Sequence, residues 1–168
     1  MAAFTPEQLM EKALGLARKA ALDGEVPVGA VVALPGGSVF EGRNRVEAGC
    51  VIDHAEMEAI RKALSALGRH GLGNATLYST AEPCLMCLGA MVQARIGGLV
   101  YGCEEPRFGG VALLQRLWAE GRYPHRFPIA AGLCGEESRR LLRDFFKKRR
   151  PNGREECRDT MQYGSIKP

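Results

Sequence analysis

The side chains best suited to metal chemistry are two cysteines three positions apart, Cys84 and Cys87, and a histidine thirty residues upstream, His54. Residues at this spacing lie on one face of a helix, so both sulfurs can reach the same ion. Pro83 is suited to the first position of a helix, which places both thiols at a helix N-terminus, where the helix dipole favours the thiolate that binds zinc. With His54 as third ligand, zinc keeps a fourth position for water, as catalytic zinc sites do.

A carboxylate follows the histidine by two residues, and this Glu56 is placed to take and return protons without binding the metal. His-x-Glu with a later Pro-Cys-x-x-Cys is the signature of zinc-dependent base deaminases. Two interpretations compete with it: a thioredoxin-like redox pair, and half of a four-ligand structural zinc site, since the chain has six cysteines. A redox pair is expected after a first strand near the N-terminus, and a structural site leaves Glu56 without a role. We therefore predict a hydrolase with one Zn²⁺ per subunit.

Length and composition indicate one globular domain. A chain of 168 residues can bury a full core, and 46% hydrophobic and 25% charged residues are ordinary values. No apolar run has the length of a membrane span, and the N-terminus lacks the basic-then-apolar pattern of a signal peptide, so we expect a cytoplasmic protein with no membrane partner. The remaining cysteines show no disulfide spacing and are expected to be reduced: Cys50, Cys103, Cys134 and Cys157.

The net charge of +4 arises entirely near the C-terminus. Residues 1–135 hold thirteen basic and thirteen acidic side chains, whereas residues 136–168 hold ten and six. A concentrated basic face favours a phosphate backbone as partner, although a solvated helix end has the same composition. The last residues are polar and lack apolar periodicity, so we expect a single deaminase domain over residues 1–150 and a disordered tail over 151–168.

Apolar periodicity and turn residues divide the chain into alternating helices and strands. This alternation predicts an α/β layered domain with a mixed sheet of about five strands flanked by helices. Both metal-binding segments lie where a loop or strand passes into a helix, so two helix N-termini are expected to face one another at the site. The expected helices cover residues 6–22, 54–68, 83–92, 113–120 and 136–148, and the expected strands cover 25–32, 38–41, 76–80, 99–102 and 127–131.

From about residue 7 to residue 150 the chain resembles the cytidine deaminase-like superfamily, and more closely the tRNA adenosine deaminases that convert the wobble adenosine to inosine. The general motifs that carry this resemblance lie at residues 25–31, 44–45, 54–57, 76–78, 82–87, 89–91 and 94–96. Two later segments are more discriminating. Residues 100–103 with 107–110 resemble the catalytic subunit of the eukaryotic enzyme, and residues 142–146 with 149–150 resemble the closing helix of the bacterial homodimeric enzyme.

The resemblance implies a three-layer cytidine deaminase-like fold and hydrolytic deamination of adenosine in a tRNA anticodon loop, where the base can leave the stack. It implies that Asn44 contacts the flipped nucleoside and that Val28 lines the base pocket. It also implies that Phe145, Phe146 and Arg149 lie on the helix that meets the anticodon loop. For the two phenylalanines, plain core packing is an equally good interpretation.

In this mechanism Glu56 is the proton shuttle, and the backbone amides near Ala55 and Cys84 are candidates for stabilising the oxygen that gains charge in the transition state. The resemblance further implies a homodimer that builds each active site across its interface, with tRNA and not DNA as the nucleic-acid partner. The loop at residues 49–53 departs from the Asp-Pro-Thr-Ala usual in the bacterial enzymes. Within it, Asp53 could orient His54 or cap the following helix.

Two alternative functions remain at this level. One keeps the zinc chemistry and changes the substrate to a free base or nucleotide such as guanine, cytosine or a cytidylate. A basic, aromatic closing helix argues against it, because a free-base pocket gains nothing from phosphate contacts. The other is a non-catalytic, zinc-folded RNA-binding subunit, whose expected mark is loss of the proton-shuttling glutamate, whereas Glu56 is present.

Overall fold

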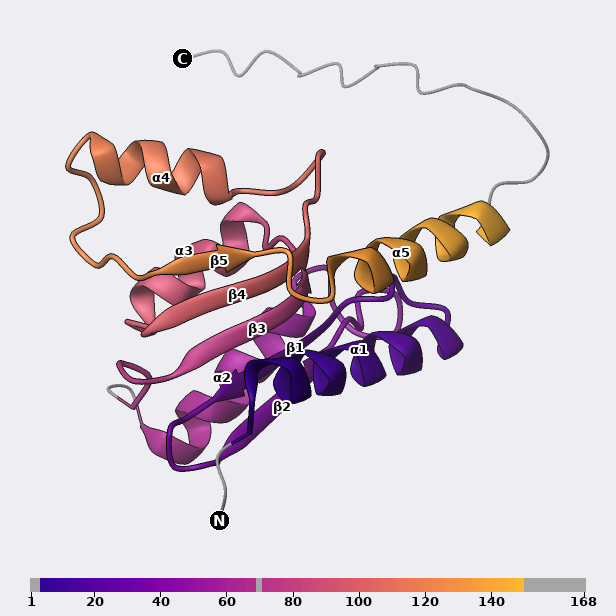
Figure 1. The fold of residues 1–168 in the computed structure, drawn as a ribbon, viewed down its shortest axis with the longest axis horizontal. Coiled ribbons are helices and arrows are strands. Elements are labelled where there is room, and N and C mark those ends of the chain that lie inside the picture. The colour runs from indigo at the N-terminus through magenta and orange to yellow at the C-terminus, as the bar shows by residue number, and fades with distance from the viewer. Residues whose placement is uncertain (1–3, 69–70, 150–168) are drawn as a thin grey trace.

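The computed structural model describes residues 4–68 and 71–149, which form alternating helices and strands (Figure 1). The tail predicted at residues 151–168 and its expected disorder lie outside the described residues. Among the described helices, none has the length and apolar character needed to cross a membrane. In chain order the elements are α1 Pro6–Leu22, β1 Gly29–Ala33, β2 Val39–Arg43, α2 Ala55–Leu67, β3 Thr76–Ala81, α3 Leu85–Gln93, β4 Gly98–Cys103, α4 Val111–Ala119, β5 Ile129–Ala131 and α5 Gly135–Arg149.

The strands form one mixed sheet in the order β2-β1-β3-β4-β5, which confirms the predicted sheet. β1 pairs antiparallel with β2 and β3, whereas β3 with β4 and β4 with β5 pair in parallel. Parallel neighbours need crossover connections, and α3 and α4 lie in these two connections. Because β3 and β4 run in the same direction, their C-terminal ends lie next to each other, and their last residues, Ala81 and Cys103, are paired.

Side chains of the central strands alternate between two separate cores, as the pleat of a sheet requires. Val31 and Tyr78 pack against α1, and α5 adds Leu141 to this core. Val32 and Leu77 point to the other face and pack with residues of α2, α3 and α4. Figure 1 shows α1 and α5 side by side on the near face of the sheet, with α2 and α3 behind it. The predicted three-layer α/β architecture is therefore confirmed.

Two glycines allow helices to pack so closely on the sheet that the backbones are in direct contact. A Cβ atom at Gly29 would lie 2.1 Å from the carbonyl oxygen of Ala13 in α1. A Cβ atom at Gly42 would lie 2.1 Å from the carbonyl oxygen of Ala55, in the first turn of α2. No side chain fits at these distances. The second contact seats the beginning of α2, next to His54, directly on β2.

We predict that Gly42→Ala lowers the free energy of unfolding by about 3 kcal/mol or more, because β2 and α2 must move apart to admit the methyl group. Gly15→Ala is the matched control, since its methyl group meets nothing within 4 Å. There, inside α1, alanine is expected to raise the free energy of unfolding by about 0.5–1 kcal/mol. Urea unfolding of both variants measures the two effects, and wild-type stability in Gly42→Ala would contradict the packing.

The helix that carries the cysteines begins later than the sequence predicts. Pro83 is not the first helical residue, because α3 starts at Leu85 with Cys84 as its N-cap. Cys84 is extended, with φ −73° and ψ 170°, and forms an isolated β-bridge with Gly109 that holds it outside the helix. Cys87 is consequently the third helical residue, still in the first turn.

The strand predicted at residues 25–32 is also shorter than expected, because β1 begins at Gly29. The N–H of Val28 donates to the carbonyl of Val26, and this local turn keeps the preceding residues out of the sheet ladder. The other helices and strands agree with the predicted ones to within two residues at each end.

Candidate active site

His54, Cys84 and Cys87 meet beyond the C-terminal ends of β2 and β3. Their ligand atoms lie within 4.8 Å of one another. The Nδ1 atom of His54 is 3.5 Å from Cys84 Sγ and 3.6 Å from Cys87 Sγ, and the two sulfurs are 3.7 Å apart. Tetrahedral zinc, with Zn–S and Zn–N bonds of about 2.3 and 2.0 Å, separates its ligand atoms by about 3.5–3.8 Å. The three residues therefore fit one zinc ion, with the imidazole binding through Nδ1.

Both metal-binding segments begin helices, and the two helix N-termini converge. His54 is the N-cap of α2 and Cys84 is the N-cap of α3, each with an extended backbone. Neither side chain caps its own helix, so the imidazole and the thiol are available to a metal. The positive ends of both dipoles and the first-turn N–H groups favour thiolate and any oxygen that gains negative charge here.

Hydrogen bonds among these side chains favour the metal-binding form of Cys84. The bond from the Cys87 thiol, followed by the bond with His54, lowers the pKa of Cys84 to about 4, so this residue is a thiolate at neutral pH. The same bond between the sulfurs raises the pKa of Cys87, and burial adds to the effect. The bond with Cys84 raises the pKa of His54. A divalent cation displaces the remaining thiol proton when both sulfurs bind it.

The Glu56 carboxylate lies beside this cluster and is almost completely buried, with 3% of the residue exposed. Ser79 Oγ donates a hydrogen bond of 3.0 Å to Glu56 Oε1, and Cys87 Sγ lies 3.6 Å from Oε2. Burial raises the pKa of Glu56 above that of an exposed carboxyl group, which disfavours its charged form. The carboxyl group is thus held next to the His-Cys-Cys cluster, where it has the chemistry of a candidate proton carrier.

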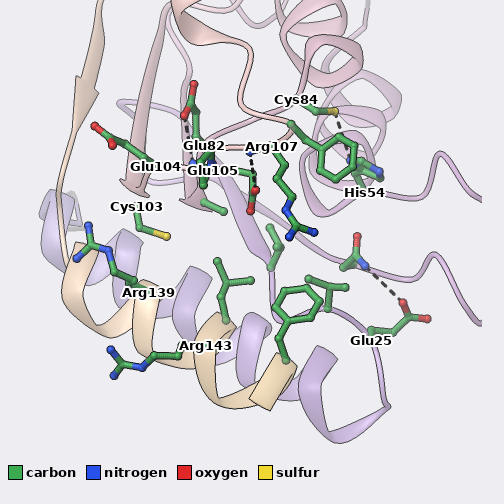
Figure 2. A pocket seen from close by; sticks show the side chains of 18 of the residues that line it. Glu25, His54, Glu82, Cys84, Cys103, Glu104, Glu105, Arg107, Arg139 and Arg143 are labelled. Carbon is green, nitrogen blue, oxygen red and sulfur yellow. Dashed lines mark hydrogen bonds between the residues drawn. The ribbon is translucent and has the colours of Figure 1, made fainter. Parts of the chain in front are cut away.

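A pocket of about 1180 Å³ opens over the cluster (Figure 2). His54, Glu56 and Cys84 line its inner end. Figure 2 shows Arg139 and Arg143 of α5 on the side of the pocket opposite His54 and Cys84. The loop between β4 and α4 forms another part of the wall, represented by Glu104, Arg107 and Phe108. This volume is slightly above the roughly 300–1,000 Å³ typical of small-molecule pockets, so the pocket has room for a ligand larger than a free base.

The substrate residues predicted from the sequence divide into two groups. Val28 and Asn44 line the pocket, and Ala55 is buried in the first turn of α2 next to His54. Phe145 and Arg149 lie outside the pocket lining. The Arg149 guanidinium stacks over the Phe145 ring at 4.5 Å and donates a hydrogen bond to the carbonyl of Gly24 at the end of α1. A role in RNA contact for Phe145 and Arg149 stays a prediction.

Another face of the same helix lines the pocket. Arg143 and Lys147, four residues apart on α5, contribute positive charge to it. Phe146 lies between them in the sequence, lines the pocket and is 45% exposed. The sequence showed the basic helix, but it gave no way to decide which of its faces meets the site.

Asp53 has neither of the two roles considered for it. Its Oδ2 accepts a hydrogen bond of 3.1 Å from the N–H of Cys50, and its Oδ1 lies 3.5 Å from Arg61. The N-cap of α2 is His54 itself. Asp53 therefore stabilises the unusual loop before the histidine.

Two further carboxylates hold the loops of the pocket, and no sequence pattern pointed to this role. Glu25 accepts hydrogen bonds from the N–H groups of Glu47 and Ala48, which lie 22 and 23 residues later in the sequence. Glu82 accepts bonds from the N–H groups of Glu105, at 3.2 Å, and Val111, at 3.0 Å, which closes the loop between β4 and α4. Both belong to the motifs of the resemblance, but contacts over such separations leave no local pattern that reveals them.

The three-layer fold, the His-Cys-Cys cluster and the adjacent buried carboxylate define a zinc-dependent hydrolytic deaminase. The family model for the cytidine and deoxycytidylate deaminase zinc-binding region matches residues 5–103. The chain belongs to this family.

Several relatives have names that refer to tRNA. The tRNA-specific adenosine deaminase of Agrobacterium fabrum is 42% identical over 142 residues, which cover 84% of this chain and 93% of that protein. The tRNA(Ile)-lysidine synthase of Deinococcus deserti is 43% identical over 143 residues, or 84% of this chain, but the chain spans only 27% of that longer protein.

Solved structures show the same fold with two kinds of substrate. A structure from a study of A-to-I editing by tRNA:A34 deaminases at the wobble position is 41% identical, with a TM-score of 0.73, and the match covers 80% of this chain and 98% of that one. A guanine deaminase from Nitrosomonas europaea is 27% identical, with a TM-score of 0.68 and 86% of each chain covered.

Proposed function

We propose that this protein deaminates adenosine to inosine at the wobble position of tRNA, with water as the co-substrate. The observation that carries the proposal is a zinc-binding cluster and a buried carboxylate at the bottom of a pocket whose outer wall is a basic, aromatic helix face. The relatives named tRNA-specific adenosine deaminase support it, because the match covers nearly their whole length.

Zinc held by the three ligands would lower the pKa of a water molecule toward neutrality. Glu56 then accepts the proton of that water and passes it to the purine ring nitrogen next to C6, while the oxygen adds to C6. Glu56 next accepts the remaining proton from the hydroxyl group added at C6 and gives it to the amino group, which leaves as ammonia as the C6–O double bond forms and the C6–N bond breaks. The N–H groups in the first turns of α2 and α3 stabilise the oxygen that gains charge. Adenosine and water thereby become inosine and ammonia.

The walls of the pocket suit a nucleoside that is still attached to its neighbours. Val28 and Asn44 border the space next to the cluster, where the flipped base enters. Phe146 offers an exposed ring on which an unstacked base can lie. Arg143 and Lys147 extend this surface with two cationic side chains for the phosphates on either side.

Removing the charges of this helix face is expected to weaken RNA binding. We predict that Arg143→Gln and Lys147→Gln each raise the Kd for an anticodon stem-loop by roughly fivefold and reduce the slope of log K against log salt by about 0.7–1. Arg116→Gln, an exposed arginine of α4, is the matched control and should change neither value. Fluorescence anisotropy over a range of salt concentrations measures both. An unchanged salt slope in the α5 variants would contradict phosphate binding at this face.

The reaction itself is tested by incubating zinc-loaded protein with total tRNA and sequencing for inosine, with adenine, guanine and cytidine as parallel substrates followed by ammonia release. Inosine at the wobble position with inert free bases supports the proposal. Ammonia from guanine with unchanged tRNA would instead favour the second candidate, a free-base deaminase, which the likeness to the guanine deaminase structure suggests. Zinc binding without either activity would leave the non-catalytic RNA-binding subunit as the better hypothesis.

We also propose that the enzyme is a cytoplasmic homodimer. Leu85 at the start of α3 and Leu113 on α4 are large apolar side chains with exposures of 52% and 41%, and a second copy of the chain could cover them. Light scattering of the purified protein tests the dimer, and a monomer mass at micromolar concentration would contradict it.

A further inference from the structure

Glu25, in the segment between α1 and β1, is a buried carboxylate at the side of the pocket. Only 1% of the residue is exposed, and it belongs to the pocket lining together with Asn44. Three donors of one loop surround its carboxylate: Asn44 Nδ2 at 3.4 Å, the N–H of Glu47 at 3.1 Å and the N–H of Ala48 at 2.8 Å. Figure 2 shows Glu25 at the rim of the pocket, with its bond to the neighbouring amide drawn as a dashed line.

Such an arrangement ties the shape of the loop to one side chain. A buried carboxylate is costly unless hydrogen bonds satisfy it, and a bond to an ionised group is stronger than one between neutral groups. An ionised carboxylate only accepts hydrogen bonds, so each atom that faces Glu25 must be a donor. The loop that begins at Asn44 is therefore held in the conformation that presents all three N–H groups.

The same requirement sets the orientation of the Asn44 amide. An amide has a donor end and an acceptor end, and Glu25 takes the donor end. The backbone of Asn44 is anchored separately, because its N–H donates to the carbonyl of Val28 at 3.0 Å. The amide oxygen is the end that remains for a molecule in the pocket.

We infer that Glu25 is a positioning residue, which orients Asn44 so that its amide oxygen accepts a hydrogen bond from a hydroxyl or N–H group of the bound nucleoside. This inference rests on the proposed deaminase function. Glu25 acts through Asn44 and does not itself contact the substrate. It makes the pocket selective for a ligand with a donor at this point, since the opposite amide orientation would present a donor instead.

Glu25→Gln tests the inference with little change of volume. Glutamine replaces one acceptor oxygen with an NH₂ donor, which opposes the N–H groups of the loop or reverses the Asn44 amide. We expect kcat/KM on an anticodon stem-loop to fall by about tenfold or more, because the substrate donor loses its acceptor. Glu120→Gln, the same change at an exposed position at the end of α4, should keep wild-type activity.

A double-mutant cycle separates positioning from a general structural role. If Glu25 acts through Asn44, Glu25→Gln lowers kcat/KM about tenfold in the wild-type background and less than about twofold in the Asn44→Ala background. Equal losses in both backgrounds would overturn the inference, as would wild-type activity of Glu25→Gln. The cycle is measured on whichever substrate the wild-type protein deaminates. If that substrate is a free base and not tRNA, the proposed function is refuted, and the cycle still tests the role of Glu25.

A second readout does not depend on activity. The side-chain amide signal of Asn44 in a ¹H–¹⁵N spectrum, assigned by its loss in Asn44→Ala, should shift in Glu25→Gln and stay in place in Glu120→Gln. An unshifted signal in Glu25→Gln would show that the carboxylate does not hold the amide, and the inference would be wrong even for a protein inactive on every substrate tried.

Discussion

Replacing Glu56 with glutamine is expected to lower kcat by about 10³-fold or more while the protein keeps its zinc. The amide has nearly the shape of the carboxyl group and can still accept the hydrogen bond from Ser79, but it cannot carry protons from water to the base and to the leaving amino group. Folding should suffer little, because burial already raises the pKa of Glu56 and so disfavours the charged form that the substitution removes. Single-turnover inosine formation and metal analysis measure the two effects separately.

Glu58→Gln is the matched control on the same helix. Glu58 accepts a hydrogen bond from the N–H of Arg43 and pairs with Lys62, away from the metal ligands, and a glutamine oxygen can keep the first contact. Its turnover should stay within about twofold of wild type. A Glu56→Gln protein with a near-normal rate would remove Glu56 from the mechanism, whatever its zinc content.

Removing one metal ligand is expected to have a similarly large effect by a different route. In Cys87→Ala, two of the three ligands remain, so bound zinc should fall from one ion per chain to less than about a tenth, and turnover should fall with it. The thermal midpoint should become independent of added zinc, whereas zinc at 100 times its Kd stabilises the wild-type protein by about 2.7 kcal/mol. Metal analysis of the purified proteins and thermal unfolding with and without a chelator measure these changes.

Cys50→Ser provides the comparison, because this thiol is exposed in the loop before His54. It should bind zinc and unfold as the wild-type protein does. Full zinc content in Cys87→Ala would mean that the ligand set is different from the one described, and it would contradict the site even if deamination were lost.

The structure agrees with the sequence analysis most closely where the signal was local. The spacing of Cys84 and Cys87 and the helix start at His54 depend on neighbouring residues, and both were recognisable as patterns. The alternation of strands and helices likewise predicted the layered domain and its mixed sheet. The prediction that the helix begins at Pro83 was wrong because Cys84 forms a β-bridge with a distant residue, Gly109, which competes with helix initiation at that point.

Contacts between distant segments were decided only by the tertiary structure. The face of α5 that meets the pocket is one example, because successive residues of a helix point about 100° apart, and a basic helix with apolar residues on several sides does not specify its own rotation. The fold turned Arg143 and Phe146 toward the pocket and Arg149 toward the end of α1.

By itself, the sequence determined which residues could carry the proposed chemistry: three candidate metal ligands and a candidate proton carrier, at spacings that bring them to the starts of two helices. The tertiary structure decided how the pocket around that chemistry is shaped. Glu25 and Glu82 each bind loops more than twenty residues away, and such contacts exist only once the sheet has brought its strand ends together. The spacing inside each zinc motif is local and could be recognised in the sequence, although His54 meets the cysteines 30 and 33 residues away only in the folded protein. The orientation of a pocket side chain such as Asn44 leaves no such local pattern, because it depends on long-range packing alone.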